Sequence, residues 1–208
     1  MELSLNLNTI EIGSIKIDIY VPDPESVRQN YEADKNREPE SPFPFWAKIW
    51  PSAFALGEYL NRHPDFVKGK RVLELAGGLG LPSIVASHYA EKVCFSDYLE
   101  EAVAVVRKTV LHNRLYNIDC AVYNWNSLPK ELSADVLLLS DVNYEPEVFD
   151  QLIKVCEKFL FSGTTIILAT PGRIIARNFI YRLDKWVKGK FEMAVDSENP
   201  VYVFLIKK

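Results

Sequence analysis

The first twenty residues alternate apolar and polar side chains. The alternation runs over residues 3–7 and again, more strictly, over residues 15–20. Because successive side chains of a strand point to opposite faces, this pattern predicts two half-buried β-strands. Asn8 and Gly13 lie close by and are expected to provide the turn residues of this N-terminal β segment.

Residues 21–45 lack such a pattern and contain five of the twelve prolines. Proline fixes φ and removes a backbone donor, so the stretch predicts a long loop, with at most one short helical turn, that could close as a lid. A helix is predicted next, over residues 50–60. Pro51 suits its first turn, and the following apolar positions recur at helical spacing.

From residue 71 onward, apolar runs and helical patterns alternate. Strands are predicted over 72–75, 93–96, 120–123, 135–139 and 164–169, and helices over 81–89, 99–113, 146–160 and 174–187. This order implies a parallel sheet covered by helices on both faces, with a ligand site at the carboxyl ends of the strands. The last two runs, 191–195 and 201–206, have no helix between them and predict an antiparallel pair.

Composition narrows the class of protein. With 208 residues, 48% hydrophobic and 25% charged, the chain is an ordinary globular protein with one main domain. A net charge of −4 provides no basic field for nucleic acid, and no apolar run approaches the ~20 residues that a bilayer requires. The odd number of cysteines, three, indicates buried thiols rather than disulfides or a metal site. We therefore expect a cytoplasmic protein that binds neither membranes nor nucleic acid.

A glycine-rich turn, Glu74-Leu75-Ala76-Gly77-Gly78-Leu79-Gly80, separates the first core strand from its helix. A dinucleotide site would need a third glycine where Ser83 stands. A carboxylate at Glu74, inside an apolar strand, would repel a pyrophosphate but attract an ammonium. The turn therefore favours S-adenosylmethionine over a dinucleotide. The alternative interpretation is that Glu74 is a surface acid.

Asp97 stands at the end of the second core strand, seventeen residues after Gly80. An acid in this position can accept both hydroxyls of a ribose. The alternative is that Asp97 only caps the helix that starts near Leu99. The pairing of Glu74 with Asp97 on successive strand ends is more specific than the glycines alone.

These motifs resemble the class I methyltransferases that depend on S-adenosylmethionine. Within them the chain is most similar to the lysine methyltransferases with an Asp-x-x-Tyr motif. The matching segments are Trp50-Pro51-Ser52-Ala53, the turn 74–80, Ser96-Asp97-Tyr98, Asn124-Trp125 and Asp141-Val142-Asn143-Tyr144, which together cover about residues 46–160. The chain departs from the family at Ala76, which replaces the first glycine of the turn, and at Asn124, which replaces an aspartate.

The resemblance implies an α/β, Rossmann-like fold with a seven-stranded sheet of order 3-2-1-4-5-7-6, in which the last strand is antiparallel. Residues 46–208 would form the methyltransferase domain. Residues 1–45 would form a small N-terminal β extension and a proline-rich loop, packed on the core or covering it.

The resemblance also implies a role for each site residue. Glu74 would hold the cofactor's ammonium, directly or through water. Gly78 and Gly80, beside Ala76, would make room for the methionine part of the cofactor, and Asp97 would bind the ribose. The adenine would stack on Trp125 and meet Asn124, while Trp50 would line the pocket. Trp125 could instead pack only in the core, and Trp50 could be the hydrophobic staple of its own helix.

Asp141 and Tyr144 follow the fourth core strand, beside the position of the transferred methyl group in this fold. They are expected to orient an incoming amine, although Asp141 could instead cap the next helix. We therefore expect a monomeric enzyme that methylates a protein lysine. Three alternatives stay open: a small-molecule amine as acceptor, an NAD-dependent oxidoreductase, and a binding protein of the same fold without turnover.

Overall fold

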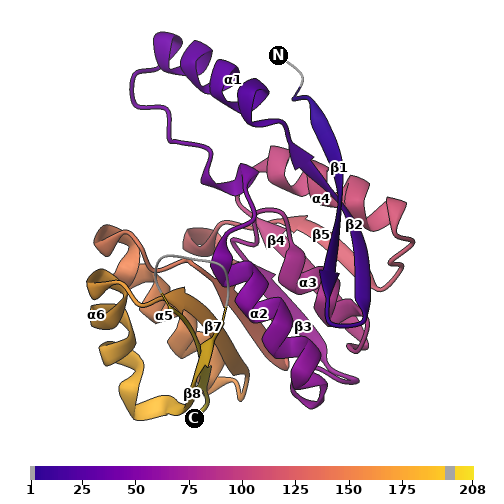
Figure 1. Cartoon of the computed structure of the whole chain (residues 1–208). Coiled ribbons are helices and arrows are strands. Elements are labelled where there is room, and N and C mark those ends of the chain that lie inside the picture. Colours follow the sequence, from indigo (N-terminus) through magenta and orange to yellow (C-terminus); the bar gives the residue numbers. More distant parts are fainter. Residues whose placement is uncertain (1–2, 195–199) are drawn as a thin grey trace.

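A mixed sheet of seven strands forms the centre of the molecule in the computed structural model, which describes residues 3–194 and 200–208 (Figure 1). The strand order is β5-β4-β3-β6-β7-β9-β8, which is the order 3-2-1-4-5-7-6 when the strands of this sheet are numbered along the chain. Neighbours from β5 to β7 are parallel, and β9 runs antiparallel to both β7 and β8. The predicted sheet and its antiparallel C-terminal pair are confirmed. The strands are β3 (Arg71–Leu75), β4 (Lys92–Asp97), β5 (Ile118–Val122), β6 (Val136–Ser140), β7 (Thr165–Pro171), β8 (Val187–Met193) and β9 (Val201–Ile206).

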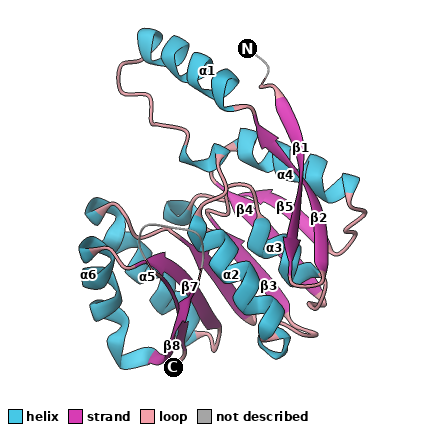
Figure 2. Ribbon diagram, viewed as in Figure 1, coloured by secondary structure: helices cyan, strands magenta, loops and turns pink. Residues whose placement is uncertain are grey.

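Helices cover both faces of this sheet, as Figure 2 shows. On one face lie α2 (Pro51–Arg62), α3 (Leu81–Ser87) and α4 (Glu100–His112), and their apolar side chains share one core cluster. On the other face lie α5 (Phe149–Phe161) and α6 (Ile174–Leu183), which form a second cluster. Strands buried on both faces have continuous apolar runs, such as Leu137 to Leu139 in β6.

An antiparallel hairpin of β1 (Leu5–Ile12) and β2 (Ile15–Pro22) packs beside the sheet without joining it. Its isoleucines, from Ile12 to Ile19, enter the same core cluster as α2, α3 and α4. The Asn113 side chain at the end of α4 binds both the N–H and the carbonyl of Asp18, which fixes the hairpin to that helix. The two predicted strands are confirmed, but Asn8 lies inside β1 and only Gly13 lies in the turn.

A 14-residue helix, α1 (Pro24–Arg37), occupies much of the segment for which we predicted a loop, so that prediction is wrong. The prolines flank the helix: Pro24 takes its first turn, where no N–H partner is needed, and the next proline is Pro39. The Asp23 side chain caps the N-terminus by accepting from the Ser26 N–H at 3.0 Å. The helix contains no buried residue, and Figure 1 shows it set apart from the central sheet.

Two other boundaries differ from the prediction. Helix α6 ends at Leu183 and a 3-10 turn, Asp184–Trp186, leads directly into β8 at Val187, so this strand starts earlier than expected. The predicted end of the strand, residue 195, lies outside the described residues. A second 3-10 turn, Pro146–Val148, precedes α5. In the described part of the chain, no helix combines the length and the apolar character needed to cross a bilayer.

Candidate active site

A cavity of about 770 Å³ opens at the carboxyl ends of the parallel strands. Residues that directly follow β3, β4, β5, β6 and β7 form its walls, and a segment from Pro42 to Ala53 closes another side. Nine of the ten predicted site residues line this cavity: Trp50, Ala76, Gly78, Gly80, Asp97, Asn124, Trp125, Asp141 and Tyr144. The tenth, Glu74, does not reach its surface.

The turn between β3 and α3 has left-handed backbone at Ala76, Gly78 and Gly80, with φ of 52°, 56° and 71°. We expected the glycines to leave room for a ligand, but the space around them is taken by the protein itself. A β-carbon at Gly78 would lie 3.3 Å from the backbone oxygen of Trp46, and one at Gly80 would lie 3.1 Å from the ring of Phe95. The glycines therefore let the turn pack closely between its neighbours.

Glu74 is fully buried beneath this turn, so its interpretation as a surface acid is wrong. Its Oε2 accepts hydrogen bonds from the N–H and the hydroxyl of Ser83, in the first turn of α3. Its Oε1 has no hydrogen-bond partner among the described residues. Burial raises the pKa of Glu74 to about 8, against the opposing effect of the two bonds from Ser83.

Gly77 separates the Glu74 carboxyl group from the cavity. Gly77 lines the cavity, and a β-carbon there would lie 3.0 Å from Cδ of Glu74 and 2.5 Å from the ring of Phe95. The floor of the cavity is therefore a bare backbone above a buried acceptor that lacks a donor. Such a floor fits a cationic or hydrogen-bond-donating group of a ligand. We had not identified Gly77 as a site residue.

Asp97, at the end of β4, connects two backbone segments. One carboxylate oxygen accepts from the Gly78 N–H at 3.0 Å, and the other accepts from the Leu99 N–H at 3.1 Å. Asp97 therefore does bind the start of the next helix, as the alternative proposed, but it also lines the cavity and holds the β3 turn. A carboxylate oxygen with one donor can accept another, so both oxygens can still bind ligand hydroxyls. Burial raises the pKa of Asp97, and the backbone donors counteract this rise.

Asn124 and Trp125 follow β5 at a 3-10 turn, Trp125–Ser127. The Asn124 side chain accepts from the Asn126 N–H at 2.9 Å and so fixes this turn. Trp125 is half-buried against the second core cluster and also lines the cavity, so core packing and ligand contact are compatible for this ring.

Phe45, Trp46 and Trp50 line the cavity on the side of the segment that precedes α2. The ring N–H of Trp50, the residue that precedes α2, donates to the carbonyl of Phe45 at 2.7 Å. The Phe45 ring lies 5.5 Å from the ring of Tyr144, between centroids. Sequence reasoning missed Phe45 and Trp46. The only signal for them was the density of aromatic residues between residues 43 and 50.

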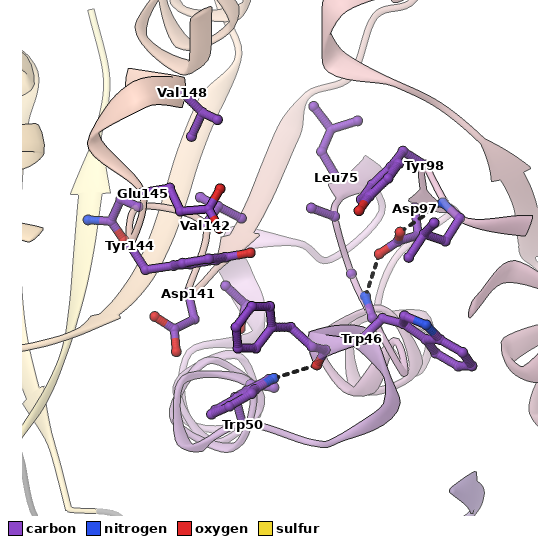
Figure 3. Close-up of a pocket in the computed structure, with 18 of the residues that line it drawn as sticks. Trp46, Trp50, Leu75, Asp97, Tyr98, Asp141, Val142, Tyr144, Glu145 and Val148 are labelled. Carbon is purple, nitrogen blue, oxygen red and sulfur yellow. Dashed lines mark hydrogen bonds between the residues drawn. The ribbon is translucent and has the colours of Figure 1, made fainter. Parts of the chain in front are cut away.

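Asp141 and Tyr144 form the wall opposite Asp97 and Tyr98, as Figure 3 shows. Asp141 has a left-handed φ of 52°, which is uncommon outside glycine and typical of functional sites. The residue at the start of the following 3-10 turn is Glu145, and no side chain caps it, so Asp141 does not act as a helix cap. Burial raises the pKa of Tyr144 to about 12, which keeps its phenol neutral at pH 7.

Comparison with known proteins identifies the family of the chain. The profile of the family described as "Lysine methyltransferase" matches residues 45–186. The chain is 32% identical to the histone-arginine methyltransferase METTL23 of Mus musculus over 111 residues, 50% of this chain and 44% of that protein. It is 30% identical to the electron transfer flavoprotein beta subunit lysine methyltransferase of Homo sapiens over 132 residues, 62% of this chain and 50% of that protein.

A third relative is the protein N-terminal and lysine N-methyltransferase efm7 of Schizosaccharomyces pombe. It is 35% identical over 130 residues, 54% of this chain and 50% of that protein. The chain thus spans about half the length of the curated relatives it matches.

Solved structures agree on the fold. The 16S rRNA N2 G1207 methyltransferase RsmC of Thermus thermophilus, solved with AdoMet and guanosine, superposes with a TM-score of 0.71 at 17% identity. The match covers 100% of this chain and 52% of that one. The putative RNA methyltransferase PH1948 of Pyrococcus horikoshii gives 0.60 at 16% identity, over 81% and 90% of the two chains. At these identities the likeness shows a shared methyltransferase fold.

The left-handed backbone at Ala76 leads to a stability prediction. Glycine adopts this conformation without a steric penalty, so Ala76→Gly should raise the free energy of unfolding by about 0.5–1 kcal/mol. The matched control is Ala104→Gly, on the exposed side of α4, which should lower the free energy of unfolding by about 0.5–1 kcal/mol. Urea denaturation of the three proteins measures both changes. Destabilisation by both substitutions would contradict the assigned strain.

The buried carboxyl group of Glu74 predicts a pH dependence. The pKa of Glu74 is about 8 in the folded protein, whereas an ordinary glutamate, as in the unfolded chain, has a pKa of 4.5. Between pH 4.5 and pH 8, the folded chain therefore binds the Glu74 proton more tightly than the unfolded chain does. Raising the pH through this window should therefore destabilise the fold, by about 1 kcal/mol for each pH unit. Glu74→Gln should remove most of this slope in urea denaturation between pH 5 and 8. Glu91→Gln, at an exposed position, should keep it. Equal slopes for all three proteins would refute the prediction.

Proposed function

The chain belongs to the lysine methyltransferase family and is an S-adenosylmethionine-dependent methyltransferase, and from this premise we propose that it methylates the side-chain nitrogen of a protein lysine. One observation carries the proposal. A single cavity has Asp97 on one wall and Asp141 with Tyr144 on the opposite wall, so a cofactor and an acceptor can meet between them (Figure 3). The relatives named above include both lysine and arginine methyltransferases.

The residues present fit the cofactor. Asp97 retains acceptor capacity for the two ribose hydroxyls. Glu74 does not reach the cavity surface, so its oxygen that lacks a donor among the described residues would act on the ammonium group through a water beside Gly77. Asn124 and the face of Trp125 are available to the adenine. When bound, the cofactor supplies a methyl group on a positively charged sulfur that leaves readily. Ser83 uses its N–H and hydroxyl to bind Glu74, an arrangement that offers nothing to the pyrophosphate of NAD.

The acceptor side needs a neutral amine. A lysine has an ordinary pKa of about 10.4, so the neutral form at pH 7 costs roughly 4.6 kcal/mol in water. Desolvation in the cavity beside Tyr144 and Phe45, together with the positive charge that the cofactor's sulfur would bring, disfavours the ammonium and reduces this cost. Asp141 favours the ammonium, so its role is to orient the nitrogen through a hydrogen bond. Placement of the nitrogen in line with the leaving sulfur can lower the activation barrier by ~7–11 kcal/mol.

A protein acceptor is favoured by the surface around the cavity. Several large apolar side chains are exposed there instead of buried: Phe43, Phe45, Tyr98, Tyr144 and Ile175 line the cavity, and Ile174 lies beside it. Grouped apolar side chains of this kind are typical of surfaces that bind proteins. Lysine is favoured over arginine because a guanidinium gives up its proton far less readily.

The acceptor is tested with cofactor labelled with tritium in its methyl group and a lysate of cells that lack the gene. Wild-type enzyme should label protein, and acid hydrolysis should release the label as methyl-lysine. Asp141→Ala should reduce the rate at least about tenfold, the loss expected from one oriented contact to the reacting nitrogen. Asp150→Ala, at an exposed position of α5, should retain the wild-type rate. Label found only in small molecules would favour the small-molecule alternative, and methyl-arginine would favour arginine.

Cofactor binding gives a separate prediction. Asp97→Ala should weaken the binding of S-adenosylhomocysteine, measured by isothermal titration, by ~1.5–3 kcal/mol, because the variant loses the ribose contacts and the link to Gly78. Asp119→Ala, on the neighbouring strand β5 and outside the cavity lining, is the control and should bind as wild type does. An unchanged dissociation constant for Asp97→Ala would contradict the assigned contact.

A further inference from the structure

Arg173 lines the cavity, but the proposed function gives it no role. It follows β7 and precedes the first residue of α6, and its side chain, 47% exposed, lines the cavity. It is the cation that pairs with Asp141: Arg173 Nη1 lies 3.8 Å from Asp141 Oδ1. The Asp141 side chain is only 10% exposed, so this pairing is weakly screened by water.

At 3.8 Å, Arg173 and Asp141 form an ion pair but no hydrogen bond. This distance is within the range of an ion pair but too long for a hydrogen bond, so the guanidinium compensates the Asp141 charge without occupying its lone pairs. Asp141 thus keeps its capacity to accept a hydrogen bond from an acceptor nitrogen. Burial raises the pKa of this carboxyl group, and the charge of Arg173 opposes that rise.

Asn143, a buried member of the Asp-x-x-Tyr segment, connects that segment to helix α6. The Asn143 side chain donates to the carbonyl of Ala176 in the first turn of α6, at 3.5 Å. The segment that contains Asp141 is therefore tied to the helix that carries Arg173. The other ionisable groups that line the cavity are Asp97, Tyr98, Tyr123, Tyr144, Glu145 and Lys48. Lys48 places its ammonium over the ring of Trp50, 5.0 Å from the centroid. Among the described residues, Arg173 is the cation that lies within ion-pair distance of Asp141.

We propose that Arg173 is a positioning residue that keeps the acceptor amine uncharged by balancing Asp141. The inference rests on the proposed function, since it assumes an acceptor lysine beside Asp141. Without Arg173, the Asp141 carboxylate would have an arriving ammonium as its counter-ion and would stabilise that charged form. With Arg173 in place, the ammonium loses this stabilisation and gives its proton to solvent at the half-exposed side of the cavity. The nitrogen lone pair would then be free to form the N–C bond while the bond between the methyl carbon and the cofactor's sulfur breaks, with its electron pair staying on sulfur.

The test compares Arg173→Gln, Arg173→Lys and Arg177→Gln. Arg177 lies one turn further along the exposed face of α6 and does not line the cavity, which makes it the matched control. The rate of label transfer to the strongest protein band of the gene-deleted lysate is measured from pH 7 to pH 9.5 and divided by the wild-type rate at each pH. The ratio removes the effect of pH on the lysate itself.

Arg173→Gln should react about tenfold more slowly than wild type at pH 7, because the reactive fraction falls tenfold for each unit by which the acceptor's pKa rises. The ratio of the two rates should increase towards 1 as the pH approaches the acceptor's pKa in the variant, which desolvation in the cavity lowers from its ordinary value. Arg173→Lys keeps the charge and should restore most of the rate at pH 7. Arg177→Gln should match wild type throughout, and both Arg173 variants should bind S-adenosylhomocysteine as wild type does.

Different results would overturn the inference and the proposed function. A loss of rate that is equal at every pH would show that Arg173 only supports the structure or docks the substrate, and it would overturn the inference alone. A wild-type rate for Arg173→Gln at pH 7, or an equal loss in Arg173→Lys, would do the same. Failure of wild-type enzyme to label any protein would instead overturn the proposed acceptor, and the inference with it.

Discussion

A fully buried carboxyl group, that of Glu74 in β3, sets the geometry of the cavity. Burying an acid is expensive unless it has partners, and Glu74 obtains its partners from Ser83 in the first turn of α3. This link fixes where α3 begins relative to β3. It also requires Gly77 above the carboxyl group, because any side chain there would collide with Phe95. The cavity floor, its exposed backbone and its unpaired acceptor all follow from this one placement.

The two walls above this floor are built differently. On the Asp97 wall, two backbone N–H groups hold the carboxylate in a fixed position, which suits a cofactor that every turnover presents in the same form. On the Asp141 wall the backbone is strained and the only counter-ion, among the described residues, is a half-exposed arginine at 3.8 Å. Such a wall is stabilised by its surroundings, and strain of this kind is characteristic of residues that act on a substrate. Pro42 and Phe43 add to the cavity from outside the matched family segment, which begins at residue 45.

The sheet could be predicted almost completely, since buried parallel strands have continuous apolar runs, and since the strand-helix alternation and the family resemblance left one strand order. The N-terminal helix α1 could not be predicted in this way. We took the five prolines of residues 21–45 as evidence against a helix, but a proline is harmful only within the helix, and Pro22, Pro24 and Pro39 stand at or beyond its ends. With no buried residue, α1 also lacks the apolar periodicity by which most helices are found.

For the site, the sequence by itself determined which residue types follow each strand: the acids at 74, 97 and 141, the glycine turn, and the Asn124-Trp125 and Asp-x-x-Tyr pairs. Because the carboxyl ends of parallel strands converge, eight of the ten predicted residues had to meet at one cavity, and Trp50 joins them from the position before α2. Only the tertiary structure decided that Glu74 lies under the floor, that the glycines make room for Trp46 and Phe95, and that Arg173 faces Asp141. These are contacts between segments far apart in the chain, whose distances depend on how helices pack on the sheet, and no local pattern of side chains encodes them.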